Sequence, residues 1–486
     1  MKLSVALAWL LFLPLISSTG MKCEYGERGS LTAICTNATP SFFKTTNYRF
    51  DYLDETLICL NCTLDTLEAG TFDIAGNEIQ TLIIKNSSIN SIRPKAFIGM
   101  IHMERLMLSD NPIETLYPGA FIGIRKVKYL EMENAVHRLE PHVFRELFML
   151  EILILRRNEL TELKAGTFEG LHNLKILDLG YNLLKTVNNT FDTLVNLLVL
   201  RLNNNMIHTI HGDDFNNLKA LLVLNLNENH LSNFSMNIGS DNHLRTLNMA
   251  ANNLSSDSFL PETFKNLNYV EDLDLSDNVF KNISPTFLHG LFRLTTLNLC
   301  RNELTTINTG SFTGLPYLRT LNFSNNQLVS LKLTGRLQLH SLSKLDLSRN
   351  NINSFDYINL ITKAPRLKYI DLVGNNLSCE LSTELETLMN EDNIDFMIIS
   401  NGGAQLDCPK VTKSYEQLMK NFTEELTRPI VNDTVLVWMF VLITLVILLV
   451  GVLFYIQFFI LLRMNSGSCK NIRIMRNLRS RTENIQ

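Results

Sequence analysis

The chemistry available to this sequence starts with its eight cysteines. Thiols pair as disulfides in secreted proteins and stay reduced in the cytosol, so their use depends on the compartment. Four cysteines precede a long repetitive region and two follow it, which predicts a disulfide-bonded cap at each end. The expected disulfide cysteines are Cys23, Cys35, Cys59 and Cys62 in the first cap, and Cys379 and Cys408 in the second. The spacing leaves the three pairings of the first four cysteines open.

Two cysteines remain after this assignment. Cys300 directly follows an inward-facing leucine inside the repetitive region, so it is expected to be an unpaired thiol. Such a thiol either packs as a small apolar residue or forms an intermolecular disulfide, which would make a dimer. Cys469 lies among basic residues near the end of the chain, where palmitoylation and a plain reduced thiol both remain open.

Two clusters of side chains have the composition of metal sites without the necessary arrangement. An acidic cluster lies on one straight segment that does not wrap around a calcium ion, and a histidine-rich cluster falls on the outer side of a repeat. The clusters are Glu271, Asp272, Asp274 and Asp277, and His208, His211, Asp213 and Asp214. We also find no serine-hydrolase, zinc-protease, phosphate-loop or kinase motif. We therefore expect no metal, no cofactor and no catalysis, and the net charge of −4 gives no reason to expect nucleic acid as a partner.

The element that positions these residues is a repeat of roughly 24 residues. In residues 174–182 it reads L-K-I-L-D-L-G-Y-N, with leucine at positions 1, 4 and 6 and asparagine at position 9. One repeat does not bury its own apolar residues, whereas stacked repeats share a continuous core. The pattern predicts an α/β solenoid, a leucine-rich repeat horseshoe with a parallel sheet on its concave face.

The ninth position is expected to hold buried asparagines whose side chains bond the backbone groups that the turn leaves without partners. We assign it to Asn111, Asn134, Asn158, Asn182, Asn205, Asn229, Asn252, Asn278, Asn302, Asn326, Asn350 and Asn375, preceded by Ser87 and Cys62. Many repeats also carry a phenylalanine that should point inward, including Phe97, Phe121, Phe144, Phe168, Phe215, Phe264 and Phe312.

Strand positions 2, 3 and 5 should face the concave surface, where solenoids of this kind most often bind. Four consecutive repeats carry apolar residues there, which predicts an exposed apolar patch with a polar rim that orients a protein partner. The patch contains Ile152, Ile154, Ile176, Leu198, Val199, Leu222 and Val223, and the rim contains Arg156, Arg157, Asp178, Tyr181, Arg201 and Asn225. The alternative is that these bulky residues merely favour strands.

Two apolar runs flank this architecture. The first follows Lys2 and ends in small residues, as in a secretory signal, and the second contains no charge and exceeds the length needed to cross a bilayer. The basic tail after it places the C-terminus in the cytoplasm, so we expect a single-pass type I protein of the plasma membrane. The expected segments are a signal peptide (1–20), an N-terminal cysteine cap with a degenerate first repeat (21–76), about 13 repeats (77–378), a C-terminal cap (379–410), a juxtamembrane stalk (411–434), a transmembrane helix (435–462) and a basic cytoplasmic tail (463–486).

Every N-glycosylation sequon precedes the second apolar run, in agreement with this topology. The sequons expected to carry glycans are Asn86, Asn188, Asn233, Asn253, Asn322, Asn376 and Asn421. Asn86 and Asn322 would place glycans on or beside the concave face near its two ends. The apolar patch lies in the open window between them.

Taken together, the signal, the cysteine caps, the repeats and the membrane helix resemble extracellular leucine-rich repeat proteins of animals. The spacing and the two-cysteine second cap are similar to insect receptor ectodomains of the Toll kind and to mosquito immune repeat proteins. The chain departs from the former because no Toll-type signalling domain follows residue 462, and from the latter because no long coiled coil follows Cys408. The resemblance implies a cell-surface receptor, co-receptor or adhesion molecule that binds a protein through its concave face. Innate-immune recognition of microbial or complement-like ligands and homophilic adhesion are the alternatives.

Overall fold

The computed structural model describes residues 22–25, 31–44, 54–74, 76–239, 241–260, 263–307, 309–331 and 339–398. All of them belong to the first of two compact units, residues 1–415, and the second unit contains residues 416–486. The expected signal peptide, stalk, membrane helix and cytoplasmic tail lie outside the described residues, as do Cys408, Asn421 and Cys469. Among the residues described, no helix combines the length and apolar character that crossing a membrane requires.

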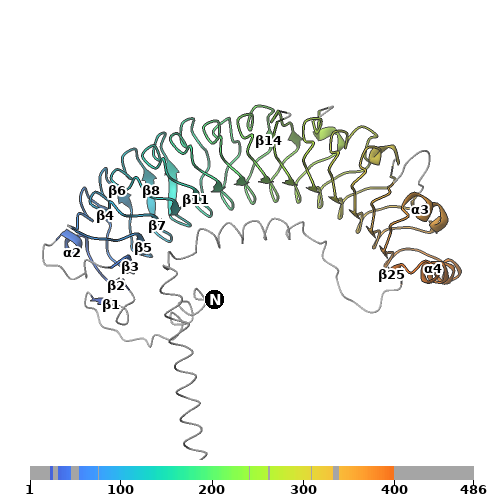
Figure 1. Cartoon of the computed structure of the whole chain (residues 1–486), viewed down its shortest axis with the longest axis horizontal. Helices are drawn as coiled ribbons and strands as arrows, with labels where there is room; N and C mark the ends of the chain where they lie inside the picture. Colours follow the sequence, from blue (N-terminus) through green and yellow to red (C-terminus); the bar gives the residue numbers. More distant parts are fainter. Residues whose placement is uncertain are drawn as a thin grey trace, which may run out of the picture. The chain divides into compact units, whose positions relative to one another are not determined.

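Stacked coils form the described part of the first unit, and each coil contributes one strand to a large sheet on the inner side of the curve (Figure 1). Each strand pairs in parallel with the strand of the next coil, and only β1 pairs in antiparallel fashion, with β2. In order along the sheet, the strands are β1 (Lys22–Tyr25), β2 (Thr32–Thr36), β3 (Thr56–Leu60), β5 (Thr81–Lys85), β7 (Arg105–Met107), β9 (Tyr129–Glu131), β11 (Ile152–Ile154), β12 (Ile176–Asp178), β13 (Val199–Arg201), β15 (Val223–Asn225), β17 (Thr246–Asn248), β18 (Asp272–Asp274), β19 (Thr296–Asn298), β20 (Thr320–Asn322), β22 (Lys344–Asp346), β24 (Tyr369–Asp371) and β25 (Asp395–Met397). The parallel-sheet solenoid predicted from the repeat is therefore confirmed.

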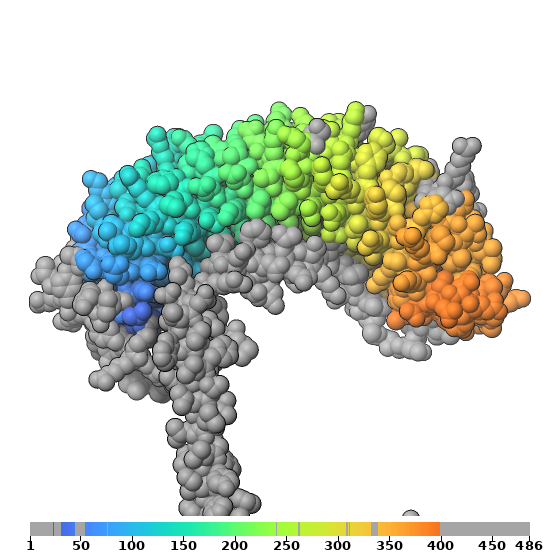
Figure 2. Space-filling view, viewed as in Figure 1, coloured from blue at the N-terminus to red at the C-terminus, as the bar shows by residue number. Residues whose placement is uncertain are grey.

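The outer side of the coils consists mainly of turns and short strand pairs, so helices contribute less than the expected α/β class implies. The strand pairs are β4 (Thr66–Leu67) with β6 (Ser91–Ile92), β8 (Ile113–Leu116) with β10 (Val136–Leu139), β14 (Thr209–Ile210) with β16 (Asn233–Phe234), and β21 (Ser330–Leu331) with β23 (Ser354–Phe355). Among the residues described, the helices are α2 (Pro40–Lys44), α3 (Tyr357–Lys363) and α4 (Cys379–Glu391), with 3-10 turns η1 (Ser256–Ser258) and η2 (Thr309–Phe312). Figure 2 shows adjacent coils in contact along the described stack.

The core lies between the sheet and the outer turns and is shared by successive coils. The central residue of each three-residue strand from β7 to β22 is a buried leucine, as at Leu153, Leu177 and Leu200, each 0% exposed. A row of stacked phenylalanine rings runs beside these leucines from Phe72 to Phe215, with neighbouring centroids 5.7–6.3 Å apart. The inward phenylalanines expected from the sequence are all buried, because each completes the core of its neighbour.

The predicted asparagine ladder is present. Asn182 illustrates it: its Nδ2 donates to the carbonyl oxygens of Leu155 and Leu179, both at 2.9 Å, and its Oδ1 accepts from the backbone N–H of Leu160 at 3.0 Å. Each buried asparagine thus satisfies backbone groups of its own coil and of the preceding one, which otherwise would lack partners away from water.

The assignment of Asn134 to this ladder was wrong. The residue before each ladder asparagine has a left-handed backbone, as at Arg157 with φ 60° and Tyr181 with φ 56°, and Asn134 has φ 50°. Asn134 therefore occupies position 8, is exposed, and donates to Asp110 at 3.1 Å. Ala135 fills the ninth position instead, and its N–H donates to Asn158 Oδ1 at 2.6 Å. The coil of β9 therefore contributes no asparagine to the ladder, and Asn158 of the next coil accepts the backbone N–H groups of Ala135 and Val136.

Both disulfides of the first cap join cysteines that are close in sequence. Cys23 pairs with Cys35 across the antiparallel β1–β2 ladder, and Cys59 pairs with Cys62. Of the three possibilities left open by the spacing, the structure selects this one. Because β2 and β3 continue the parallel sheet into the cap, the disulfides lie at the exposed end of the stack, where terminal coils lack a neighbour.

Two of the cysteine predictions beyond the first cap were wrong. Cys300 was expected to be unpaired, yet it is fully buried and disulfide-bonded. Cys379 was expected to pair with Cys408, yet its thiol is free and exposed at the start of α4. Ser378 caps this helix by accepting from the N–H of Leu381 at 3.2 Å, so α4 closes the stack without a disulfide at Cys379. Sequence proximity misled the assignment because pairing follows spatial distance.

Candidate functional site on the concave face

The residues that flank each central leucine point to the concave face, because side chains alternate along a strand. In β7 and β9 both flanking residues are half-buried, whereas in β11, β13, β15 and β17 the first is buried and the second half-buried. In β12 both are buried. We call the strands β3, β5, β7 and β9 the amino-terminal concave surface and the strands from β11 to β20 the central concave surface.

The predicted exposed apolar patch belongs to the central concave surface and is not exposed. Ile152, Ile176, Val199 and Val223 are between 0% and 2% exposed, while Ile154, Leu198 and Leu222 are half-buried. None of the first four belongs to the hydrophobic core, which lies on the other side of the sheet. The prediction that these residues are exposed was wrong. The alternation of side chains along a strand predicts which face of the sheet a residue lies on, but it does not predict whether that face is open to solvent.

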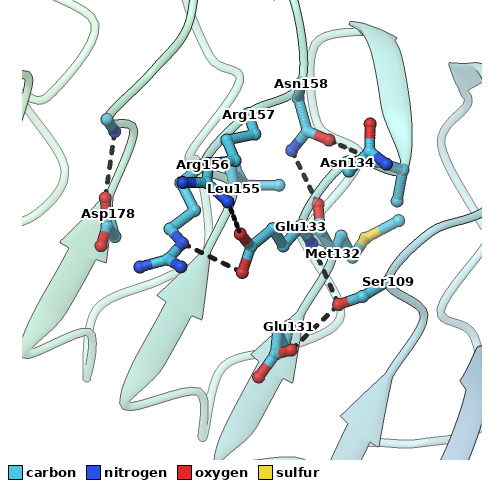
Figure 3. A network of polar contacts seen from close by, with 12 residues as sticks. Ser109, Glu131, Met132, Glu133, Asn134, Leu155, Arg156, Arg157, Asn158 and Asp178 are labelled. Carbon is cyan, nitrogen blue, oxygen red and sulfur yellow. Dashed lines mark hydrogen bonds and ion pairs between the residues drawn. The ribbon is translucent and has the colours of Figure 1, made fainter. Parts of the chain in front are cut away.

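A network of ion pairs and hydrogen bonds occupies the concave face where β7, β9 and β11 meet (Figure 3). Glu133 forms ion pairs with two arginines of the next coil. Its Oε2 lies 2.9 Å from Arg156 Nε, and its Oε1 lies 3.4 Å from Arg157 Nη1. Burial lowers the pKa of Arg156, but the bond to Glu133 and neighbouring negative charges outweigh it and raise this pKa overall. The guanidinium group is thus held charged and fixed in place.

Tyr129 and Glu131 form the second part of the network. The Tyr129 hydroxyl donates to Glu131 Oε2 at 2.5 Å, and Ser109 Oγ donates to Glu131 Oε1 at 2.9 Å. Burial, together with the negative charge of Glu131, raises the pKa of Tyr129, so this phenol stays protonated at any physiological pH. The Arg105 guanidinium lies 4.6 Å from the Tyr129 ring centroid, in the geometry of a cation–π contact.

The predicted rim residues continue the network into the next coils. Arg157 lies over the ring of Tyr181 at 5.1 Å, and Tyr181 is 48% exposed. Arg201 Nη1 pairs with Asp178 Oδ2 at 2.8 Å, and Asp178 is only 3% exposed. Asn225 Oδ1 accepts from the N–H of Asn227 at 3.1 Å, a bond within its own turn. The structure therefore joins Arg156, Arg157 and Tyr181 to one cluster and separates Asn225 from it.

Sequence reasoning missed Arg105, Tyr129, Glu131 and Glu133. These residues occupy positions 3, 5 and 7 of the repeats that contain β7 and β9, so the side chains at those positions were the signal that could have identified them. In the coil of β9 these positions were misassigned, because Asn134 was placed at position 9 instead of position 8, which shifted the register by one residue. With that register corrected, the alternation alone places Tyr129 and Glu131 on the concave face.

Residues of the two clusters that have the composition of metal sites form ion pairs and hydrogen bonds within the protein. Asp277 forms a two-pronged ion pair with Arg301, at 2.5 Å and 2.8 Å, and Asp274 Oδ1 accepts from both the N–H and the hydroxyl of Ser276. Asp214 accepts from the N–H of His211 at 2.7 Å. Within the described residues no group of three or more such side chains has the geometry to hold a metal ion.

The described sequons differ in accessibility. Asn86, Asn188, Asn233, Asn253 and Asn376 are exposed. Asn322 lies on β20, is 3% exposed, and its Oδ1 accepts from the N–H of Ser324 at 2.9 Å. This burial argues against a glycan on Asn322 in the folded protein, whereas the sequence alone led us to expect one there.

Comparison with known proteins agrees with this fold. The family model "Leucine rich repeat" matches residues 77–136, 148–207 and 292–352. No curated protein matches the sequence. In the Drosophila Toll–Spatzle complex, one chain is 20% identical with a TM-score of 0.57; the alignment covers 76% of this chain and 55% of that chain.

Two further solved structures share the solenoid. The APL1 leucine-rich repeat domain is 19% identical with a TM-score of 0.57, and the alignment covers 77% of this chain and 94% of that domain. A chain of the LRIM1/APL1C complex is 19% identical with a TM-score of 0.53, and the alignment covers 94% of this chain and 83% of that chain. The described part of this protein is thus a parallel-sheet solenoid, consistent with a leucine-rich repeat horseshoe and similar in fold to these structures.

Proposed function

We propose that this protein is a non-enzymatic recognition molecule of the cell surface that binds a protein partner through the amino-terminal concave surface together with the adjoining Arg156 and Arg157, which follow β11. The observation that carries the proposal is the fixed cluster of Tyr129, Glu131, Glu133, Arg156 and Arg157. Tyrosine and arginine dominate the energetics of protein interfaces, and side chains already held in place lose little entropy on binding. The proposal replaces the apolar patch with this cluster as the site of contact.

Display at the cell surface rests on the sequence alone. The expected signal peptide would deliver the repeats to an oxidising compartment, and the two cap disulfides suit that environment. The charge-free run at 435–462 would hold the protein in the membrane as a receptor, co-receptor or adhesion molecule.

Innate-immune recognition is the second candidate. It draws on solved complexes of similar fold: Toll with Spatzle, described as a hub in development and innate immunity, and LRIM1 with APL1C. A protein ligand from a microbial surface would favour this candidate, and a second copy of the same chain would favour homophilic adhesion.

Photo-crosslinking in the full-length chain tests the proposal. A photoreactive phenylalanine analogue replaces Tyr129, and the matched control replaces Tyr117, which is 54% exposed and follows β8 on the outer side. We expect a protein to cross-link at position 129 but not at position 117, and its binding in purified form to weaken at least about tenfold with Arg157→Ala, as for an interface anchor. Equal cross-linking at both positions, or unchanged affinity of the Arg157→Ala variant, would contradict the proposal.

A further inference from the structure

The residues that immediately precede the strands of the large sheet form a row along one edge of the stack. From β7 to β24, each donates its backbone N–H to the carbonyl oxygen of its counterpart in the preceding coil, so successive members are neighbours. In the first coils of this row acids and bases alternate and pair. Lys128 Nζ lies 3.2 Å from Glu104 Oε1, and Lys175 Nζ lies 2.7 Å from Glu151 Oε2. The bases of this part of the row therefore neutralise acids of the neighbouring coil.

The alternation changes after β18. The last acid of the row is Glu271, and in the following coils Thr295 and Ser343 stand where acids would continue the pattern. Their hydroxyls donate to the carbonyl oxygens of the preceding members of the row, at 3.0 Å and 3.1 Å. Arg319 and Lys368 keep the positions of the bases. These two bases thus have hydroxyl residues beside them in place of carboxylates.

Further bases lie in the same coils. Two of them are found two residues earlier in their turns, and one is the first residue of β22. We call the five residues together the basic edge: Arg293, Arg319, Lys344, Arg366 and Lys368. All five are exposed, and within the described ranges none of them forms an ion pair. The basic edge therefore has a role other than joining one coil to the next.

Acidic groups and sequons are missing from the sequence of these turns. Each turn contains lysine or arginine and none contains aspartate or glutamate, in residues 286–296, 311–320, 339–344 and 361–369. The acids at the ends of β22 and β24, Asp346 and Asp371, accept backbone N–H groups of their own turns at 3.0 Å and 2.9 Å. The basic edge is thus a positive surface on which no N-glycan is expected.

Aromatic rings accompany the bases. The Arg293 guanidinium lies 4.6 Å from the centroid of the Tyr269 ring, a cation–π contact that orients it. Phe292 and Tyr317, in neighbouring turns, are 45% and 56% exposed. Flat rings beside fixed positive charges provide an apolar contact as well as an ionic one.

The layout of the basic edge suits a long, negatively charged polymer. Three strand spacings separate β19 from β24, about 14 Å, and the bases are distributed over all four coils. A chain with repeated anionic groups contacts several of these bases at once, whereas a small anion contacts one or two. Protein interfaces are depleted of charge at their centre, but here charge extends along the whole edge. An arginine fork also holds two oxygens of one anionic group.

We propose that the basic edge binds a sulfated polysaccharide chain that lies across the coils from β19 to β24. Since the whole chain has a net charge of −4, the attraction comes from this local surface. The choice of a sulfated polysaccharide over nucleic acid rests on the cell-surface display in the proposed function. The tests use the purified protein without a protein partner, so a failure of this proposal is distinguishable from a failure of partner recognition.

Binding of the full-length protein to immobilised heparin tests the proposal. Arg319→Ser with Lys368→Ser removes two bases of the basic edge, and the matched control, Lys128→Ser with Lys175→Ser, removes two ion-paired bases of the same row. At about 0.15 M salt, we expect the first pair to raise the Kd at least about tenfold and the control pair to raise it less than about twofold. The slope of log Kd against log salt concentration should fall by about 2 in the first variant, because fewer counterions are released.

Other anionic probes separate a polysaccharide from an acidic protein. Heparin without its sulfates and poly-glutamate should each bind at least about tenfold more weakly than heparin. Tighter binding of poly-glutamate would assign the surface to an acidic protein and overturn the proposal. Equal losses in the two double variants, or no binding of heparin by the unchanged protein, would also overturn it.

Lysine acetylation locates the contact without a substitution. With heparin at roughly ten times its Kd, Lys344 and Lys368 of the full-length protein should be acetylated roughly tenfold more slowly than without it, while Lys128 and Lys175 should keep their rates. Mass spectrometry of the digested protein measures all four. Equal protection of Lys128 and Lys175 would overturn the proposal.

Discussion

The two parts of the concave face share one backbone and differ in exposure. In β7 and β9 both residues beside the central leucine are half-buried, whereas in β12 both are buried. The strands pair in the same parallel register, and the leucines, phenylalanines and ladder asparagines continue on the core side. The difference therefore arises above the sheet, and the fold of the repeats does not determine which concave residues are available to a partner.

Glycan occupancy gives the largest contrast, since a sequon is either modified or not. We expect Asn86, beside the amino-terminal concave surface, to carry a glycan and Asn322, on the central concave surface, to carry none, because Asn322 is 3% exposed. Glycopeptide mass spectrometry of the full-length protein measures both sites. A glycan on Asn322 is incompatible with the closed packing of this face.

The ladder should be equally important under both surfaces. Asn111 and Asn278 each donate to three carbonyl oxygens, and Oδ1 accepts two backbone N–H groups at Asn111 and one at Asn278. Replacing either by alanine orphans these buried groups and should lower the free energy of unfolding by about 3 kcal/mol. Thermal unfolding measures the loss, with Asn134→Gly as the exposed control. If only one of the two substitutions lowered stability, the two surfaces would differ in the hydrogen-bonded core of the repeats and not only in exposure, which would contradict this expectation.

Isoleucine residues on the two surfaces provide a matched pair. Ile176 on β12 is 0% exposed and Ile83 on β5 is half-buried. Ile176→Glu should lower the free energy of unfolding by about 2 kcal/mol, because apolar burial is lost and a charge must displace what covers it, whereas Ile83→Glu should change it by less than about 0.5 kcal/mol. Denaturant titration of both variants compares them. Similar losses would remove the distinction between the surfaces.

The smallest effect concerns Asp272 on β18. Burial raises the pKa of Asp272 above its ordinary value, so the folded protein binds this proton more tightly than the unfolded chain. Stability then falls as pH rises from the unfolded pKa through the raised folded pKa, and the penalty persists at neutral pH. Asp272→Asn should therefore stabilise the protein by less than about 1 kcal/mol at pH 7, and the gain should shrink towards pH 3. The control is Asp110→Asn at an exposed position, and a gain independent of pH would contradict this explanation.

The repeat, the buried phenylalanines and most of the ladder could be predicted from the sequence, because each depends on spacing within one coil and its neighbour. Asn134 was misplaced because its coil holds alanine at the ninth position and asparagine one residue earlier. The site was harder to predict for the same reason, since Tyr129 and Glu131 belong to that coil.

Two features lay beyond sequence reasoning. The spacing of the cysteines gave no sign that Cys300 is disulfide-bonded, and Cys379 was assigned to a disulfide only because it lies near Cys408 in sequence. The burial of Val199 and Val223 depends on what packs above the sheet, which the alternation of a strand does not encode.

Hydroxyl-radical footprinting of the full-length protein tests the distinction between the two surfaces most directly, because one experiment reports the solvent exposure of side chains on both. Modification rates are normalised to those of the unfolded chain. We predict that Ile83 and Met107 are modified at least about tenfold faster than Ile176, Val199 and Val223, in line with their exposure. Comparable rates across the concave face would show that the central surface is open, and would contradict the account.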